Sequence, residues 1–259
     1  MNVDLKNRVA LVTGAARNIG KAIADQFAAN GAQVVYSDID LAEATPAASA
    51  SSGTAVHLDV ADQAEVEAVV RQIVRQFGRI DILVNNAGIN TLAHRVPIDQ
   101  FPLEEWERIV RVDLTGLYLV SHAVAGVMRP QKYGRIVNIS SVVGLVPLRL
   151  QCAFAAAKAG VVNLTRAMAI ELGHLGITVN CVAPGSILTA GTKKLFYGEE
   201  GKFREAVSQL IAHIPVGRPG SSEEVAHAVT FLAAEESRYI NGAVLTVDGG
   251  WTAGYAREF

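Results

Sequence analysis

Seven short apolar runs rich in β-branched residues alternate with segments of helical periodicity from Val9 to about Val247, without a Pro/Ser-rich linker. This alternation is typical of βαβ units in one parallel sheet covered by helices on both faces, joined by right-handed crossovers. The sequence therefore predicts an α/β fold with a doubly wound parallel sheet. The expected strands are Arg8–Thr13, Gln33–Asp38, Thr54–Asp59, Ile80–Asn85, Gly134–Ser140, Thr178–Ala183 and Ala243–Val247. Apolar spacings of three and four predict helices from Ile19, Gln63, Glu104, Cys152 and Glu223.

One continuous domain over residues 1–259 is the expected organisation, because single α/β domains commonly reach about 250 residues. The segment 188–215 breaks the rhythm with glycines and lysines. We predict that it is a polar insertion with a short helix that acts as a substrate lid. The small-residue segment Ala42–Ser52 predicts no more than a weak helix and a turn.

Composition limits the partners of this chain. Its 23 basic and 25 acidic residues give a net charge of -2 and a pI near 6.3 without a basic stripe, which argues against nucleic acid and anionic membranes. Cys152 and Cys181 have neither disulfide nor zinc-site spacing, so no metal is predicted. No apolar stretch is long enough to span a bilayer, and the N-terminus does not match a signal peptide. We therefore expect a cytoplasmic, reduced protein.

The first expected strand runs directly into a glycine turn, Thr13-Gly14-Ala15-Ala16-Arg17-Asn18-Ile19-Gly20, that opens the first helix. Such a turn cradles a phosphate, because glycines admit close approach while backbone N–H groups and the helix dipole face the anion. Asp38 ends the next strand 24 positions after Gly14, near the interval expected for a ribose-binding carboxylate. It would repel a 2′-phosphate, which favours NAD over NADP. The alternative is that Asp38 only caps or turns the chain.

A set of motifs in this order resembles the classical short-chain dehydrogenases/reductases over essentially the whole chain. The motifs are Thr13-Gly14-x-x-x-Asn18-Ile19-Gly20, Asp59-Val60, Asn85-Asn86-Ala87-Gly88, Ser141, the helix of Lys158 and Pro184-Gly185. The resemblance implies a single Rossmann domain, a nicotinamide cofactor, a small-molecule substrate and a homotetramer. The cofactor contacts that it implies are Gly14, Arg17, Asn18, Ile19, Gly20, Asp38, Asp59, Val60, Asn86, Ala87, Gly88, Lys158, Pro184, Gly185, Ile187 and Thr189.

The resemblance also assigns places along the cofactor. It puts Asp59 and Val60 against the adenine, Asn86 and Gly88 along the dinucleotide, and Ile187 and Thr189 at the nicotinamide carboxamide. For Asn85 and Ala87 the alternative is that they only shape the turn after the fourth strand. Asn18 stands where the family has its middle glycine, and Asn tolerates left-handed backbone angles, so we expect the cradle to persist.

Hydride transfer between a carbinol and nicotinamide needs a group that takes or gives the hydroxyl proton near neutral pH. In the family, a tyrosine and a lysine four residues apart on one helix do this, with a serine upstream, and the lysine stabilises the phenolate and bonds the ribose. Lys158 matches the lysine, and Ser141, 13 positions before Phe154, matches the serine where Ser140 does not. Asp113 stands at the family's asparagine, which acts through its backbone carbonyl and a water, so Asp113 is expected to serve similarly.

Phe154 occupies the position of the family's tyrosine. A phenyl ring has no proton donor or acceptor, and losing one positioned acid/base group costs roughly 10²–10⁴ in rate. We therefore expect this chain to fold and bind cofactor but to be nearly inactive. Because the exchange removes a single oxygen, it is a change made to trap bound complexes, which favours an engineered variant over a natural loss. The alternative is a catalytically silent relative that binds or senses NAD or scaffolds an oligomer.

Substrate contacts are expected after the fourth and fifth strands, because ligands lie beyond the carboxyl ends of parallel strands. Asn90 and His94 follow the fourth strand, and Arg149 and Gln151 follow the fifth, together with Ser141. An arginine fits a carboxylate and amides fit hydroxyls. The alternative for each is a surface loop side chain.

The C-terminal segment 248–259 is similar to the tails of sugar and sugar-acid dehydrogenases in this family, which often pack near a neighbouring active site. Arg257 or Phe259 would then complete a pocket, and the alternative, the plainer expectation, is a frayed terminus. We predict an NAD-dependent secondary-alcohol dehydrogenase for a small, polyhydroxylated, neutral or anionic substrate such as a sugar acid or its 2-keto-3-deoxy derivative. A 3-oxoacyl-type ketoreductase is a further alternative. Asp38 disfavours it if the reductant must be NADPH, and Arg149 and Gln151 disfavour it if the pocket must take an acyl chain.

Overall fold

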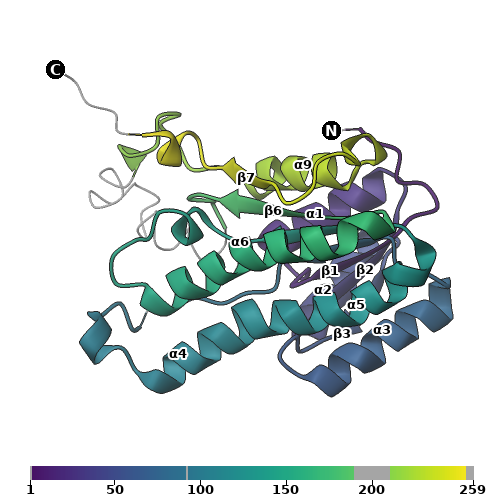
Figure 1. Cartoon of the computed structure of the whole chain (residues 1–259), viewed down its shortest axis with the longest axis horizontal. Helices are drawn as coiled ribbons and strands as arrows, with labels where there is room; N and C mark the ends of the chain where they lie inside the picture. The colour runs from purple at the N-terminus through teal and green to yellow at the C-terminus, as the bar shows by residue number, and fades with distance from the viewer. Residues whose placement is uncertain (1, 92, 190–210, 255–259) are drawn as a thin grey trace.

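The computed structural model describes residues 2–91, 93–189 and 211–254. Within these ranges the expected strands form one seven-stranded parallel sheet in the order β3-β2-β1-β4-β5-β6-β7 (Figure 1). Their bounds are β1 Val9–Thr13, β2 Gln33–Asp38, β3 Thr54–His57, β4 Ile82–Asn85, β5 Gly134–Ile139, β6 Ile177–Pro184 and β7 Val244–Val247. The predicted fold class, a doubly wound Rossmann-type sheet, is confirmed. β3 ends two residues earlier than expected.

Helices cover both faces of the sheet (Figure 1). The helices on one face are α1 (Asn18–Ala29) and α9 (Ser222–Ala233), and those on the other are α3 (Gln63–Phe77), α5 (Leu117–Gln131) and α6 (Cys152–Leu172). Successive strand residues point to opposite sides, so Ala10 and Val12 pack in the core under α1 while Val9 and Leu11 pack in the core under α3. Both faces of the sheet are therefore buried.

Two helical segments differ from expectation. Leu41–Ala50 forms a full helix, α2, because the Asp40 carboxylate accepts the N–H of Glu43 at 3.1 Å and the small side chains of this segment pack inward. The helix expected from Glu104 begins at Leu103 as α4 (Leu103–Val110) and continues into α5 through a π-helical stretch, Arg111–Gly116. This stretch carries Asp113.

Most of the predicted lid, residues 190–210, lies outside the described residues. Its described start is held by backbone bonds, since the Leu188 N–H donates to the Gly220 carbonyl at 2.8 Å. In the described part of the chain, no helix is long and apolar enough to cross a membrane.

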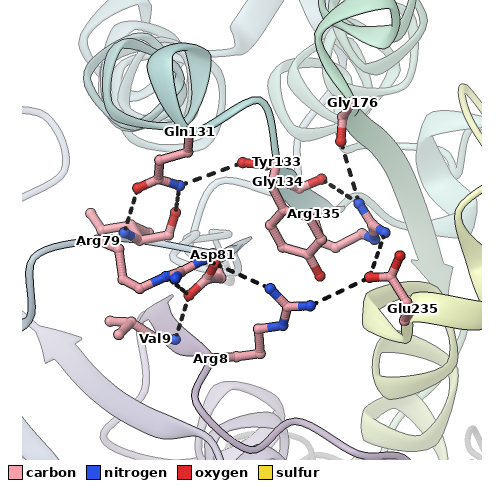
Figure 2. Close-up of polar contacts among 11 residues, drawn as sticks. Arg8, Val9, Arg79, Asp81, Gln131, Tyr133, Gly134, Arg135, Gly176 and Glu235 are labelled. Carbon is pink, nitrogen blue, oxygen red and sulfur yellow. Dashed lines mark hydrogen bonds and ion pairs between the residues drawn. The ribbon is translucent and has the colours of Figure 1, made fainter.

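A polar network around the buried Asp81 holds the amino-terminal edge of the sheet (Figure 2). Asp81, fully buried directly before β4, accepts the Val9 N–H at 2.9 Å and Arg79 Nε at 2.8 Å. Arg8 lies 3.6 Å from the Asp81 carboxylate and 3.5 Å from that of Glu235. These bonds tie the starts of the central strands together, while the opposite edge is open.

Candidate functional site

A cavity of about 530 Å³ lies at the carboxyl edge of the sheet, where its lining follows the ends of β1, β2, β4 and β5. Open α/β sheets bind ligands in this place. The predicted site residues that line it are Gly14, Arg17, Asn18, Ile19, Gly20, Asp38, Asp59, Val60, Asn86, Ala87, Gly88, Asn90, Asp113, Phe154, Lys158 and Thr189. Sequence reasoning missed six further lining residues, namely Ile39, Leu58, Ile89, Val112, Ile139 and Ser140.

The turn after β1 has the close-packed backbone that a phosphate cradle requires. Gly14 has a φ of +64°, and a Cβ on Gly20 would lie 2.0 Å from the Gly14 carbonyl oxygen. Asn18 has a φ of 51°, the left-handed conformation expected of Asn in place of glycine. The side chain of Arg17, the N-cap residue of α1, makes no hydrogen bond to the backbone N–H groups at the start of the helix. The start of this helix lines the cavity. This turn fits the pyrophosphate of a dinucleotide.

Thr13 and Asn86 hold the turn against the segment after β4. Thr13 Oγ1 accepts the N–H groups of Asn86 and Ala87, both at 3.0 Å. The Asn86 amide donates to the carbonyl oxygens of Thr13 and Gly14, both at 2.9 Å. Asn86 and Ala87 therefore shape the cavity wall through bonds within the protein.

Asp38 lines the cavity and also binds backbone. Its Oδ2 accepts the Ala16 N–H at 3.0 Å, and its Oδ1 accepts the Asp40 N–H at 3.0 Å. Arg17 is paired with Glu43 and lies 3.9 Å from Asp40. Asp38 therefore turns the chain, and the same residue also lines the cavity.

At the other end of the cavity, Lys158 and Asp113 form a buried ion pair. Lys158 Nζ lies 3.1 Å from Asp113 Oδ2, and it donates to the Ile139 carbonyl at 3.3 Å. Asp113 Oδ1 accepts the Ile89 N–H at 2.7 Å. The ring centroid of Phe154, one turn before Lys158 on α6, lies 5.6 Å from Nζ. The structure therefore brings together the ammonium group, a carboxylate and the aromatic ring.

Comparison with known proteins identifies the family. The family model described as Enoyl-(Acyl carrier protein) reductase matches residues 14–252. The chain is 39% identical over 252 residues to the 3-oxoacyl-[acyl-carrier-protein] reductase FabG of Escherichia coli (strain K12), covering 96% of this chain and 98% of that protein. It is 41% identical over 251 residues to the FabG of Thermotoga maritima, covering 95% and 98%. The chain belongs to the classical short-chain dehydrogenase/reductase family.

Solved structures support the assignment. Levodione reductase has a TM-score of 0.90 and is 36% identical, covering 97% of this chain and 100% of that one. A candidate gluconate dehydrogenase from Agrobacterium tumefaciens has a TM-score of 0.91 and is 31% identical, covering 98% and 100%. This short-chain dehydrogenase/reductase is thus an oxidoreductase of a family that uses NAD or NADP and acts on small molecules.

The two serines after β5 have different surroundings in this short-chain dehydrogenase/reductase. Ser140 is buried and donates from Oγ to the Lys158 carbonyl at 2.8 Å. Ser141, predicted to hold the substrate oxygen, is half-buried, and its Oγ accepts the Val143 N–H at 3.2 Å. Ser140 lines the cavity as part of its wall, with its hydroxyl directed into the protein.

The predicted substrate residues have different surroundings. Asn90 donates from its amide to Gln151 Oε1 at 3.0 Å, so the segments after β4 and β5 meet there. Arg149 is exposed and lines a second cavity of about 290 Å³, which Gln151 borders as well. His94 lies beside Thr91 and is 3.8 Å from Glu105.

Glu105 keeps its negative charge beside His94. The Arg108 guanidinium lowers the pKa of Glu105 from 4.5 to about 2, with smaller contributions from Thr91 and His94. The structure therefore gives His94 a polar partner away from Lys158 and Phe154.

At the end of β6, Thr189 lines the cavity and Ile187 forms a backbone bridge to Gly220. The Gly185 N–H donates to the Val247 carbonyl at 3.0 Å, directly after Pro184 closes β6. Arg257 and Phe259 lie outside the described residues. No group of three or more metal-ligating side chains occurs in the part of the chain that the structure describes.

Proposed function

We propose that this protein is built for NAD-dependent interconversion of a secondary alcohol and a ketone on a small polar, sugar-derived substrate, and that Phe154 inactivates it. The observation that carries the proposal is one cavity that runs from Asp38, the last residue of β2, to Lys158 and Phe154 on α6. A dinucleotide reaction needs both ends: an acceptor for the ribose hydroxyls and a pair that handles the alcohol proton.

The charges at the ribose end support NAD over NADP. Asp38 presents a carboxylate there, and Arg17, the cation that could meet a 2′-phosphate, is already paired with Glu43 and lies near Asp40. A 2′-phosphate would therefore meet three carboxylates and one compensated guanidinium. Because like charges repel, these carboxylates disfavour the binding of NADP.

The residues at the other end have separate tasks. The cofactor, when bound, would supply a hydride acceptor as NAD⁺ and a hydride donor as NADH. Lys158 bonds the nicotinamide ribose and would stabilise a phenolate at position 154. Ser141 Oγ accepts the Val143 N–H. Its own hydroxyl hydrogen would be donated to the substrate oxygen. Asp113 holds a water of the proton relay through its backbone carbonyl, whereas Phe154 transfers no proton.

Polar groups beside the cavity support a hydroxylated substrate. The bonded amides of Asn90 and Gln151 retain donors and acceptors for hydroxyl groups. The fold likeness to a candidate gluconate dehydrogenase supports the same substrate class. Arg149 is proposed to attract a carboxylate, and Arg149→Ala in an active Phe154→Tyr background should raise KM for acids more than for neutral sugars. An unchanged preference for acids would remove the anionic substrate.

A 3-oxoacyl-type ketoreductase is the second candidate function. It is supported by the names of the relatives from Escherichia coli and Thermotoga maritima, which match nearly the whole chain. A third candidate, a silent NAD-binding or scaffold protein, is supported by Phe154 at the acid/base position. The three candidate functions predict different activities for a Phe154→Tyr protein, in which the phenol is restored.

The decisive experiment is the Phe154→Tyr protein beside the parent chain. NADH formation would be measured on sugars and sugar acids, and NADH or NADPH consumption on a 3-oxoacyl thioester, from about pH 7 to about pH 10. We expect a gain of about 10²–10⁴ on a sugar-derived alcohol. A gain confined to the thioester with NADPH would favour the ketoreductase. NAD binding without any gain would favour the silent protein.

We also propose that the protein is cytoplasmic, as its composition indicates, and that it forms the homotetramer that the family resemblance implies. Tyr118 on α5 and Ile170 on α6 are 50% and 82% exposed, and association would bury these large side chains. Light scattering should give four times the 27.5 kDa of the chain. A monomer mass would contradict this state.

A further inference from the structure

Asp113 departs from the family's asparagine within the same site in which Phe154 departs from its tyrosine. Its carboxylate is fully buried in the π-helical stretch between α4 and α5, where it reaches both the segment after β4 and the helix of Lys158. An asparagine could accept the Ile89 N–H just as Asp113 Oδ1 does. The carboxylate adds one thing only, a negative charge 3.1 Å from Lys158 Nζ.

The pair forms part of the cavity wall. A Cβ placed on Gly88 would lie 3.1 Å from Asp113 Oδ2 and 3.2 Å from Lys158 Nζ, so glycine at this position leaves the pair uncovered on that side. Lys158 itself is only 5% exposed. A ligand in the cavity would therefore meet a compensated ion pair rather than a lone ammonium.

The other ionisable groups that face this pair, in the described part of the chain, leave the balance unchanged. Arg108 on α4 acts on Asp113 from a distance and is itself bonded to Glu105 at 2.7 Å. Cys181 on β6 lies near Lys158, and burial raises the pKa of its thiol to about 11, so it is neutral near pH 7. The charge next to the aromatic position is thus set by residues 113 and 158.

We propose that Asp113 is a positioning residue that fixes Lys158 and cancels its charge. The part of the cavity wall that these two residues form, called the floor of the site below, is then neutral. Two consequences follow for this chain. A neutral floor tolerates the positive nicotinamide ring of NAD⁺, whereas an uncompensated ammonium would favour NADH. A phenolate at position 154 would also be stabilised less by Lys158 than by an unpaired ammonium, because a carboxylate already engages this ammonium.

The first test uses binding and needs no turnover. The ratio of the NAD⁺ and NADH dissociation constants would be measured by calorimetry for the parent chain, Asp113→Asn, Lys158→Met and the double variant, whose floors carry charges of 0, +1, -1 and 0. We expect Asp113→Asn to shift the ratio about fivefold toward NADH and Lys158→Met to shift it toward NAD⁺. The double variant, the matched control, should return to the parent ratio.

A ratio that does not follow the floor charge would overturn the proposal. Should one single variant fail to fold, as judged by its thermal transition, the other still changes the charge by one unit in the opposite direction. The double variant also separates charge from shape, because it alters both side chains without changing the net charge.

The second test rests on the proposed function. A tyrosine phenol has an ordinary pKa of about 10, so the activity of Phe154→Tyr should rise toward alkaline pH. Adding Asp113→Asn should free the ammonium and move this midpoint down by about one pH unit or more. Equal midpoints in the single and double variants would overturn the proposal while leaving the proposed function intact. Inactivity of both, with the ratio following the floor charge, would overturn the proposed function alone.

Discussion

Asp81 and Asp113 are fully buried carboxylates that lie beside cations, one at the amino edge of the sheet and one at the carboxyl edge. Asp81 is saturated: Oδ2 accepts the Val9 N–H and Arg79 Nε, and Oδ1 binds Arg79 and Arg8 (Figure 2). Asp113 Oδ2 has Lys158 Nζ at 3.1 Å and no hydrogen-bond partner besides it among the described residues.

The difference indicates that the two carboxylates have different roles. A carboxylate with every oxygen occupied holds strands together and offers nothing to a ligand. A carboxylate that has one oxygen paired only with a lysine beside a cavity sets the charge that a ligand meets. The two edges should therefore respond oppositely to substitution, with Asp81 controlling stability and Asp113 controlling cofactor preference.

The largest effect on stability is expected at the amino edge. Asp81→Ala removes the partner of Arg79 and of the Val9 N–H, and should lower the free energy of unfolding by about 3 kcal/mol. Urea denaturation measures this, and Asp81→Asn is the control because it keeps one acceptor. Calorimetry should show an unchanged ratio of NAD⁺ and NADH affinities in the folded protein. A changed ratio would break the comparison.

A smaller loss is expected at the carboxyl edge. Lys158→Met leaves the Asp113 carboxylate buried without its cation, but the adjoining cavity admits water, so we expect a loss of about 2 kcal/mol. Adding Asp113→Asn removes the stranded charge and should restore most of that stability in the same urea experiment. A double variant no more stable than the single one would show that the pair contributes through shape rather than charge.

The sheet could be predicted because its signal is local. Each strand is a short apolar run, and burial on both faces makes such runs continuous rather than alternating. The π-helical stretch could not be predicted in this way. Gly116 lies so close to Val60 that a Cβ would be 2.8 Å from the Val60 Cγ2, and this contact joins segments far apart in the chain. The geometry around Asp113 therefore arises from tertiary packing.

The candidate site likewise has features that local spacing predicts and contacts that arise only from tertiary packing. Asn18 and Asp38 follow from spacing within one βαβ unit, and the structure places both at the cavity. The bond between Asn90 and Gln151 joins residues 61 positions apart, which no spacing rule describes. Arg149 and Gln151 both line the second cavity, but Arg149 is exposed and Gln151 is buried. Leu150 between them adopts a left-handed φ of 64° and turns the chain.

A moderate effect is expected at the ribose end of the carboxyl edge. Asp38→Ala removes the carboxylate that would bind the ribose hydroxyls and repel a 2′-phosphate, so the preference for NAD over NADP should fall about tenfold. Calorimetry with both dinucleotides measures it. Because Asp38 also accepts two backbone N–H groups, Asp38→Asn serves as the control that keeps an acceptor. Equal NAD and NADP binding by the parent chain would contradict the assignment.

The smallest effect on stability is expected where a carboxylate is exposed. The loss measured there is the size that the losses at the two buried pairs should exceed. Glu224 pairs with Arg218 at 2.7 Å and accepts the Ser221 N–H at 2.8 Å at the start of α9. Arg218 first, and then the Ser221 N–H, lower the pKa of Glu224 from 4.5 to about 2. Because this native value lies below the unfolded one, the contribution is present above about pH 4.5 and is lost as the pH falls toward 2.

Solvent screens this exposed pair, so Glu224→Gln should cost only about 0.5 kcal/mol at neutral pH. Urea denaturation at neutral and acidic pH checks the sign, because the parent and variant stabilities should converge as the acid protonates Glu224. The matched variant Arg218→Gln should show a smaller loss, since the Ser221 N–H still holds the carboxylate. A loss as large as that of Asp81→Ala would mean that exposure does not separate these carboxylates, and the comparison of the two edges would fail with it.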